Sequence, residues 1–378
     1  MRNAIIGIII GVVVGVVLGA TTIAPRLQQS KVPEARLTEK AKPAATLPPP
    51  PEKPAARPVV RWRMASAYNG NLPQIGALAK RVGRNVWRVS GGGVDIKFFE
   101  PDVLSSNRDL MEAISTGTID AAFASPGIWG DSFPVLHFFS SLPFGPSTNE
   151  YLAWIYFGGG QVLADKFFNS HNIQGIFCGL TSPSGSGWFR NQIITLEDLQ
   201  GLKVRFLGLG GKVMKELGVN PQSQQGGDIF IDLESNAIDG AEFSMPSIDM
   251  NMKFYEIAKN YYLPGWHRPE SLFVLMVNLE KWHALSGTRK AQIETVCGDN
   301  ILHGIAESEA AQFKALKELS AKGVKIRKLP TEILEALKKA WPEVVKKEVA
   351  ADPDFKRAWD SLSKFRKEYA IWKELGHL

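Results

Sequence analysis

The chain has 378 residues, of which 44% are apolar and 22% are charged; these proportions exclude a wholly disordered or fibrous protein. The formal net charge of +6 lies mostly in residues 1–60, which carry eight Lys/Arg against three Asp/Glu. Residues 61–378 are left with 36 basic and 35 acidic residues, so they have no charge excess for binding nucleic acid. Two cysteines, Cys178 and Cys297, exclude a disulfide-rich scaffold and a four-cysteine metal site.

The first 24 residues indicate a segment that enters a membrane. Residues 4–24 contain no charged side chain, and as a helix they would extend about 30 Å, the thickness of a bilayer core. The run is longer than the apolar part of a usual cleaved signal peptide, and Arg2 precedes it. We therefore expect residues 1–24 to form an uncleaved signal anchor, a transmembrane helix. Cleavage after Ala20 or Ala24 is the alternative.

Four glycines of this segment are spaced four residues apart: Gly7, Gly11, Gly15 and Gly19. On a helix they would share one face, and small residues on such a face allow a second helix to approach closely. The spacing favours a homo-oligomer paired through this face, with chance spacing of a common residue as the alternative.

Residues 25–60 have the composition of a linker. They contain nine of the 23 prolines, including four in a row at 48–51. Such a segment buries too little apolar surface to fold, and consecutive prolines favour an extended conformation. We expect a proline-rich stalk between the anchor and a soluble region.

From residue 61 onward, short apolar runs alternate with amphipathic helical patterns. Strands are predicted at 94–99, 119–123, 202–206, 238–243 and 272–278, and helices at 106–115, 211–217, 288–322, 331–350 and 353–375. The segments ISTGTIDAAFASP and LESNAIDGAEFSMP resemble one another. These patterns predict an α/β protein with two lobes of similar construction. Aromatic residues at helical spacing in the last two helices are expected to be core: Trp341, Phe355, Trp359, Phe365, Tyr369 and Trp372.

Several kinds of site are unsupported by the residue pattern. We expect no disulfide between Cys178 and Cys297, because each lies in a different apolar element and both are expected to be buried. The six histidines show no zinc-binding spacing. The glycines around Gly208 and Lys212 lack the remaining residues of a phosphate loop. They favour a glycine-rich helix start that lines a cleft and points backbone N–H groups at an anion.

Arg205 is the strongest candidate for ligand binding. It ends an apolar strand just before that glycine turn, a position that faces the ligand crevice of α/β proteins, and its planar fork matches a carboxylate. A surface arginine on an edge strand is the alternative. Glu242 is similarly placed between apolar residues and would need a cationic partner if buried. Trp129 and Trp188, each beside a glycine, could form apolar walls of the pocket.

Four stretches carry a resemblance to a known family: GWFRNQIITLEDLQGLKVR at 187–205, AIDGAEF at 237–243, YYLPGWH at 261–267 and VNLEKWHAL at 277–285. They resemble the extracytoplasmic solute-binding subunit of tripartite ATP-independent periplasmic (TRAP) transporters, in the branch that binds mannitol and chloroaromatic or 2-oxo acids. The resemblance covers about residues 62–340. It implies a two-lobed, type II-like periplasmic-binding-protein fold with hinge strands.

The resemblance also implies roles for individual residues. Arg205 matches the arginine that pairs with the ligand carboxylate. Glu242 and the main chain of Phe243 match positions that hold a cation, Na⁺ or Ca²⁺, bridging to that carboxylate. The chain departs from the branch at Ser184, which stands where a glutamine ligand is usual, and at Phe243, which replaces a tryptophan.

The expected organisation is a signal anchor at 1–24, a stalk at 25–60 and two lobes. Lobe 1 comprises 61–182 with about 268–308, and lobe 2 comprises 183–267 with about 309–378, including the C-terminal helices. The implied function is a periplasmic receptor, held at the inner membrane, that captures a small organic acid and delivers it to TRAP permease subunits. A membrane-tethered carboxylate sensor is the alternative, and an enzyme using Glu242 as a general base is less favoured because no second acid or histidine has motif-like spacing.

Overall fold

The computed structural model describes residues 59–224 and 226–376. The signal anchor at 1–24, the stalk up to residue 58 and the glycine face at Gly7, Gly11, Gly15 and Gly19 lie outside the described residues. The last residue of the stalk expected at 25–60, Val60, begins the first strand. Among the described helices, none combines the length and the hydropathy needed to cross a membrane.

The first sheet has five strands in the order β2-β1-β3-β10-β4. Strands β2, β1 and β3 are parallel, whereas β10 is antiparallel to both β3 and β4. Every residue of β10 is buried, as expected for the continuous apolar run LFVLMVN in a central strand. The strands are β1 (Val60–Ser66), β2 (Val94–Phe99), β3 (Ala121–Ala124), β4 (Ile173–Thr181) and β10 (Ser271–Asn278).

The second sheet has six strands in the order β11-β9-β5-β8-β6-β7. β8 is shorter than the predicted strand 238–243, because it pairs with β5 and β6 only through Gly240 and Ala241. The chain therefore leaves the sheet at Glu242, next to the end of β6 at Arg205. The strands are β5 (Gly187–Phe189), β6 (Lys203–Arg205), β7 (Asn220–Gln222), β8 (Gly240–Ala241), β9 (Asn260–Leu263) and β11 (Lys325–Lys328).

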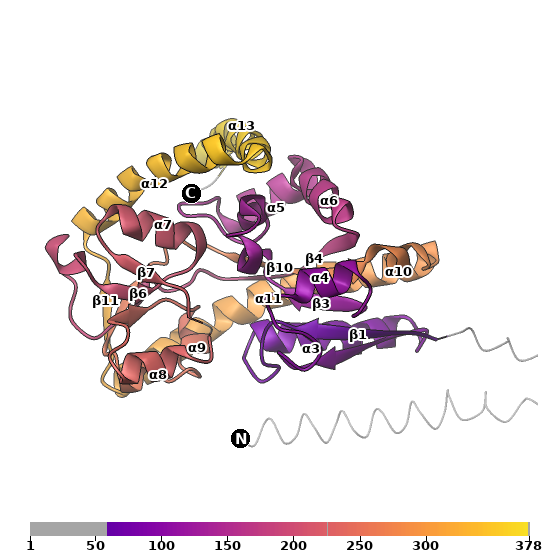
Figure 1. The fold of residues 1–378 in the computed structure, drawn as a ribbon, viewed down its shortest axis with the longest axis horizontal. Helices are drawn as coiled ribbons and strands as arrows, with labels where there is room; N and C mark the ends of the chain where they lie inside the picture. The colour runs from indigo at the N-terminus through magenta and orange to yellow at the C-terminus, as the bar shows by residue number, and fades with distance from the viewer. Residues whose placement is uncertain (1–58, 225, 377–378) are drawn as a thin grey trace, which may run out of the picture. The chain divides into compact units, whose positions relative to one another are not determined.

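Helices cover both sheets and connect them (Figure 1). The described α-helices are α3 (Ile75–Val89), α4 (Leu110–Ser115), α5 (Thr148–Phe157), α6 (Gly160–Ser170), α7 (Gly208–Glu216), α8 (Ile229–Glu234), α9 (Pro246–Asp249), α10 (Leu279–His283), α11 (Gly287–Ala321), α12 (Thr331–Ala351) and α13 (Pro353–Gly376). Short 3-10 helices are η2 (Pro126–Trp129), η3 (Pro134–Phe139), η4 (Glu197–Leu199) and η5 (Phe254–Glu256).

Two long connections join the sheets. Helix α11 packs on β4 and α3 beside the first sheet, and on α9 and β11 beside the second. Helix α12 packs on α7, and α13 returns to η3, α5 and α6 (Figure 1). Phe355 of α13 is fully buried and meets Phe138 edge to face at 4.8 Å between ring centroids. The expectation that all six aromatics of these helices are core is wrong for Trp372, which is 59% exposed, because the core-facing side of α13 ends before the last turns.

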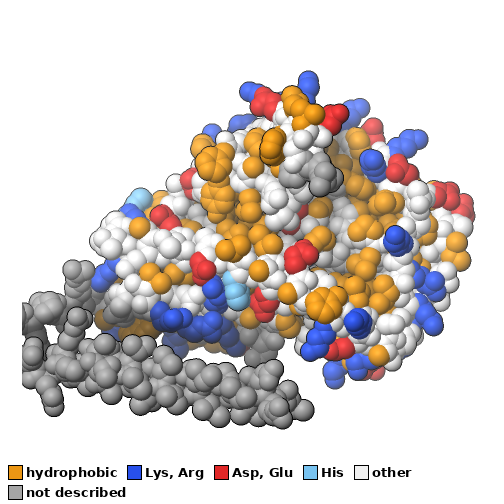
Figure 2. Space-filling model, turned by 180° about the vertical axis from the view of Figure 1, so that it is seen from behind, with side chains coloured by type: hydrophobic (Ala, Val, Ile, Leu, Met, Phe, Trp, Pro, Cys, Tyr) orange, Lys and Arg blue, Asp and Glu red, His pale blue; other side chains and the backbone are white. Residues whose placement is uncertain are grey.

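Figure 2 shows basic and acidic side chains among hydrophobic ones on one face of the protein. The presence of both signs of charge agrees with the nearly balanced charge of residues 61–378.

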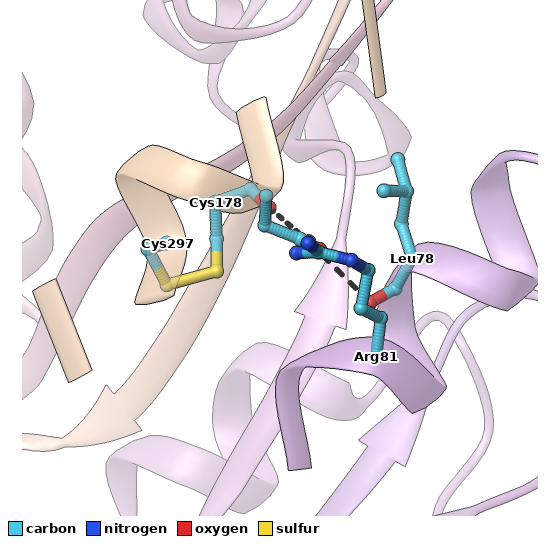
Figure 3. Close-up of a disulfide and its surroundings, with 5 residues drawn as sticks. Leu78, Arg81, Cys178 and Cys297 are labelled. Carbon is cyan, nitrogen blue, oxygen red and sulfur yellow. Dashed lines mark hydrogen bonds between the residues drawn. A yellow bond between two sulfur atoms is a disulfide. The ribbon is translucent and has the colours of Figure 1, made fainter. Parts of the chain in front are cut away.

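Cys178 and Cys297 form a disulfide, contrary to the expectation from the sequence (Figure 3). Cys178 lies on β4 and Cys297 on α11, and these two elements pack directly against each other. Location on different elements does not prevent pairing here, because burial at a shared interface brings the two sulfur atoms together. Beside the disulfide, the fully buried Asn300 donates hydrogen bonds to the carbonyls of Cys178 (2.6 Å) and Leu78 (3.4 Å), which ties α11 to β4 and α3.

Candidate functional site

A cavity of about 140 Å³ lies between the two sheets. One water molecule needs roughly 10–15 Å³ measured in this way, so the cavity has room for a small organic molecule. Residues beside the first sheet form one wall, and residues beside the second sheet form the other. The main polar or charged side chains in the lining are Tyr68, Ser125, His137, Ser140, Ser141, Arg205, Ser244, His267, Arg268 and Ser271, and the main apolar ones are Ile75, Ile128, Phe243 and Phe273.

The wall from the first sheet is polar but uncharged. Tyr68 follows β1 and Ser125 follows β3, so both side chains stand at the carboxyl ends of parallel strands, where ligands bind in open α/β sheets. The Tyr68 hydroxyl accepts a hydrogen bond from the Ser125 N–H at 3.2 Å, and Ser125 Oγ lies 2.6 Å from Ser140 Oγ. Burial raises the pKa of Tyr68, so its hydroxyl is neutral near pH 7. This wall therefore offers neutral hydrogen-bonding groups.

His137 of η3 reaches from this wall toward the start of α7. A side chain at Gly208 would meet the His137 ring at 2.6 Å, and the φ of +58° at Gly208 is in the left-handed region. Glycine is therefore required there on two grounds. Burial lowers the pKa of His137 to about 3, and Lys212 and Arg268 add to the effect, so the ring is neutral at physiological pH.

The glycine-rich start of α7 lines the cavity at Gly208, Leu209 and Gly210, in the place where the sequence predicts a helix start facing a cleft.

Arg205 is the last residue of β6, and its side chain is 5% exposed. Its Nη1 lies 3.2 Å from Glu242 Oε2 and donates to the Glu242 carbonyl, and its Nε donates to the Gln224 carbonyl at 3.3 Å. Burial lowers the pKa of Arg205 to about 10, against the raising effect of Glu242, so the guanidinium remains charged near pH 7. Among the described residues its Nη2 has no hydrogen-bond acceptor, which leaves a donor for a ligand in the cavity that Arg205 lines.

Glu242 lies behind the cavity rather than in its lining, and its side chain is 1% exposed. The backbone N–H of Glu242 donates to the Arg205 carbonyl at 2.9 Å, which holds the two residues side by side. Its Oε1 lies 3.2 Å from His267 Nε2 and 3.3 Å from Arg268 Nη1. Burial alone would raise the pKa of Glu242, but Arg268, His267 and Arg205 outweigh burial and hold that pKa at about 2. The carboxyl group is therefore ionised.

Sequence reasoning selects neither His267 and Arg268 nor the polar residues of the opposite wall, which are Tyr68, Ser125, His137 and Ser140. His267 and Arg268 directly follow PGW of the YYLPGWH stretch, on the segment between β9 and β10. Burial lowers the pKa of His267, so the ring is neutral, while the Arg268 side chain is 26% exposed and lines the cavity. The signal that could have found Arg268 is its position immediately after the motif that carries the resemblance.

Three predicted pocket residues lie away from the cavity lining. Trp188 is fully buried in the second sheet, where it stacks on Tyr261 at 4.1 Å and donates through Nε1 to Asp249 Oδ2 at 2.9 Å. Trp129 is buried and donates through Nε1 to the Arg108 carbonyl at 3.0 Å. The Ser184 N–H donates to the Arg268 carbonyl at 3.1 Å. Ser184 and Trp188 thus support the residues around Arg205, and Phe243 is the one aromatic of the predicted set that lines the cavity.

Comparison with known proteins identifies the family. The model of the family described as "Bacterial extracellular solute-binding protein, family 7" matches residues 65–352. The chain belongs to this family. Family 7 proteins are receptors that bind solutes for transport, which confirms the prediction of a two-lobed solute-binding receptor rather than an enzyme.

Relatives of this family 7 chain include proteins with known ligands. The present chain is 32% identical to a monocarboxylate 2-oxoacid-binding periplasmic protein of Nostoc. The alignment covers 86% of the present chain and 89% of the Nostoc protein. A TRAP solute-binding protein of Bordetella bronchiseptica, holding copurified calcium and picolinate, is 32% identical with a TM-score of 0.81, over 84% of this chain and 95% of that one. A TRAP solute-binding protein of Pseudoalteromonas atlantica, with bound sodium and pyruvate, is 27% identical with a TM-score of 0.79, over 84% and 97%.

Proposed function

We propose that this chain is a periplasmic receptor that captures a small organic monocarboxylate between its two lobes. It delivers the acid to the membrane subunits of a TRAP transporter. The observation that carries the proposal is Arg205, a buried guanidinium at the edge of a cavity of about 140 Å³. The cavity suits an acid of the size of pyruvate or picolinate, the compounds bound by the two relatives.

The charges around the cavity favour a ligand with one carboxylate. Arg205 and Arg268 line the cavity and bring two positive charges, and Glu242 behind them brings one negative charge. His137 and His267 are neutral because burial lowers the pKa of each. The buried Asp249 also interacts with Arg205 and Glu242, but burial raises its pKa to about 7, so it adds less than a full negative charge near pH 7. The positive charge that remains is balanced by one carboxylate, whereas a second carboxylate would be left unpaired.

The proposal assigns the carboxylate to Arg205, with Arg268 and the N–H groups at the start of α7 on the same side. The hydroxyls of Tyr68, Ser125 and Ser140 on the opposite wall would bind the remaining polar atoms of the acid. Because a ligand between two lobes is best removed from water by both, we propose that the lobes close around it. The division into lobes at 61–182 with 268–308, and 183–267 with 309–378, is part of this proposal.

We also propose that residues 1–24 hold the receptor at the inner membrane, that residues 25–60 act as the stalk, and that the face of Gly7, Gly11, Gly15 and Gly19 pairs two copies. The supporting observations are the uncharged run, the proline content and the four-residue spacing.

Calorimetric titration of pyruvate and picolinate into the full-length protein tests the ligand assignment. Each charge-assisted hydrogen bond contributes about 1.5–3 kcal/mol, so removing the clamp that Arg205 Nη2 provides, by Arg205→Ala, is expected to weaken binding by about 10- to 100-fold. Arg205→Lys should also bind weakly, because an ammonium group cannot reproduce the planar fork. Arg357→Gln, a change of an exposed arginine on α13, is the matched control. Unchanged affinity in Arg205→Ala would contradict the clamp, and no binding of either acid by the wild type would contradict the proposed ligand class.

A further inference from the structure

Arg268 is held in a defined position by its backbone and its side chain. Its N–H donates to the Gly265 carbonyl at 3.0 Å, and its own carbonyl accepts from Ser184 N–H at 3.1 Å. Its Nη1 donates to the Phe243 carbonyl at 2.9 Å and lies 3.3 Å from Glu242 Oε1. One guanidinium nitrogen therefore contacts both a carboxylate oxygen and the neighbouring main-chain oxygen.

These are the two oxygens that the family resemblance assigns to a bridging cation, and the relatives from Bordetella and Pseudoalteromonas hold calcium and sodium. In this chain the donor set does not fit a resident metal ion. Calcium takes six to eight oxygen ligands. The Phe243 carbonyl accepts a hydrogen bond from Arg268, and Glu242 Oε2 accepts one from Arg205. Glu242 Oε1 accepts none among the described residues, although it lies 3.3 Å from Arg268 Nη1, so one carboxylate oxygen is left for a metal ion. Across the described residues, no group of three or more His, Cys, Asp or Glu is arranged to hold a metal.

Electrostatics also disfavours a metal ion here. A metal ion bound to Glu242 would lie among two guanidinium groups, in a region where burial weakens the screening by water. Its positive charge would be repelled by both. Before the acid binds, Glu242 is the one fully ionised carboxylate beside these three cations, because burial raises the pKa of Asp249 to about 7.

We propose that Arg268 supplies, as part of the chain, the positive charge that a bound cation supplies in the relatives, so that this receptor binds its acid without a metal ion. The inference rests on the proposed function and adds to it the residue that completes the carboxylate site. A guanidinium stays charged at all physiological pH values and presents directed N–H donors, so the site is independent of calcium and sodium concentrations.

The test uses full-length protein treated with a chelator and exchanged into sodium-free buffer. Pyruvate and picolinate are titrated by calorimetry in three buffers: without added cation, with about 1 mM calcium chloride, and with sodium chloride. The calcium concentration equals the dissociation constant of the weakest extracellular calcium sites, about 1 mM. Calcium chloride alone is titrated in parallel. The wild type is expected to bind acid with the same affinity, within about twofold, in all three buffers, and to bind no calcium in this range.

Arg268→Gln removes the charge and keeps a polar side chain, and Arg357→Gln is the matched control. We expect Arg268→Gln to lose about tenfold or more in affinity without added cation, and the control to behave as the wild type. Partial recovery of Arg268→Gln with calcium or sodium would support the replacement directly. Circular dichroism melts establish that both variants are folded.

Three results would overturn the inference: a gain of about tenfold or more in wild-type affinity on adding calcium or sodium, binding of calcium alone by the wild type, or full affinity of Arg268→Gln without cation. Failure of the proposed function looks different, because the wild type would then bind neither acid in any buffer. The titration with calcium alone would still decide whether the site takes a metal ion.

Discussion

Removal of the Cys178–Cys297 disulfide is expected to destabilise the protein by up to about 5 kcal/mol. The bond closes a loop of 119 residues between β4 and α11. In the chain-entropy account, a cross-link of this span restricts the unfolded chain by about 5 kcal/mol at 25 °C. For a folded unit of the size of Arg57–Leu378, this corresponds to a decrease in Tm of about 7 °C.

The assay is denaturant unfolding of the wild type, Cys178→Ala, Cys297→Ala and the double variant. Each single change already breaks the cross-link, so each is expected to cost nearly the whole amount. The second change should add only the local loss of buried contacts, about 1 kcal/mol. Reducing agent should destabilise the wild type to the level of the single variants and leave all three variants unchanged.

The pattern of additivity decides whether the bond exists. If the single variants each cost about 1 kcal/mol and their effects add in the double variant, the two sulfur atoms are not joined. The same conclusion would follow if reducing agent left the unfolding transition of the wild type unchanged. Either result would restore the expectation from the sequence that the two cysteines remain unpaired.

Two further predictions concern acid stability and domain independence. Folding lowers the pKa of Glu242 from 4.5 to about 2, so the folded protein binds fewer protons than the unfolded chain between these values, and stability is lost as pH falls through them. The difference in unfolding free energy between the wild type and Glu242→Gln should therefore shrink by about 2 kcal/mol from about pH 6 to about pH 3 in denaturant titrations, and a constant difference would contradict the lowered pKa. A variant lacking residues 1–60 should unfold cooperatively, remain in the soluble fraction and bind the same acid as the full chain, because Arg57–Leu378 forms a compact unit of its own; loss of cooperative unfolding would show that the N-terminal segment contributes to the fold.

Features with a local pattern could be predicted from the sequence. The apolar run of β10 and the long amphipathic run of α11 appear in the structure at Ser271–Asn278 and Gly287–Ala321, within one residue of the predicted bounds. The position of Arg205 followed from a charge at the end of an apolar strand. In each case neighbours in sequence determine the signal, through side-chain periodicity or strand polarity.

Features that depend on distant neighbours could not be predicted in this way. Arg268 is 63 positions from Arg205, and nothing in its immediate sequence shows that its guanidinium reaches Glu242. The glycine before Trp188 predicts a pocket wall, but pairing of β5 with β8 and β9 places its ring in the hydrophobic core beside the second sheet, with Phe254 and Tyr261. The prediction of unpaired cysteines is wrong for the same reason, since the packing of α11 on β4 is a property of the whole fold.

The unequal walls of the cavity have a consequence for the order of events in binding. Both guanidinium groups contact Glu242 at the end of β8, whereas Tyr68, Ser125 and Ser140 beside the first sheet are neutral. An approaching anion is attracted over a distance by charge, while hydroxyl groups act only at contact. The first encounter is therefore with the arginine side, and its rate falls with ionic strength. The residence time depends on the short-range contacts of both walls, including the buried guanidinium of Arg205, so only the arrival of the ligand is controlled by one half of the protein.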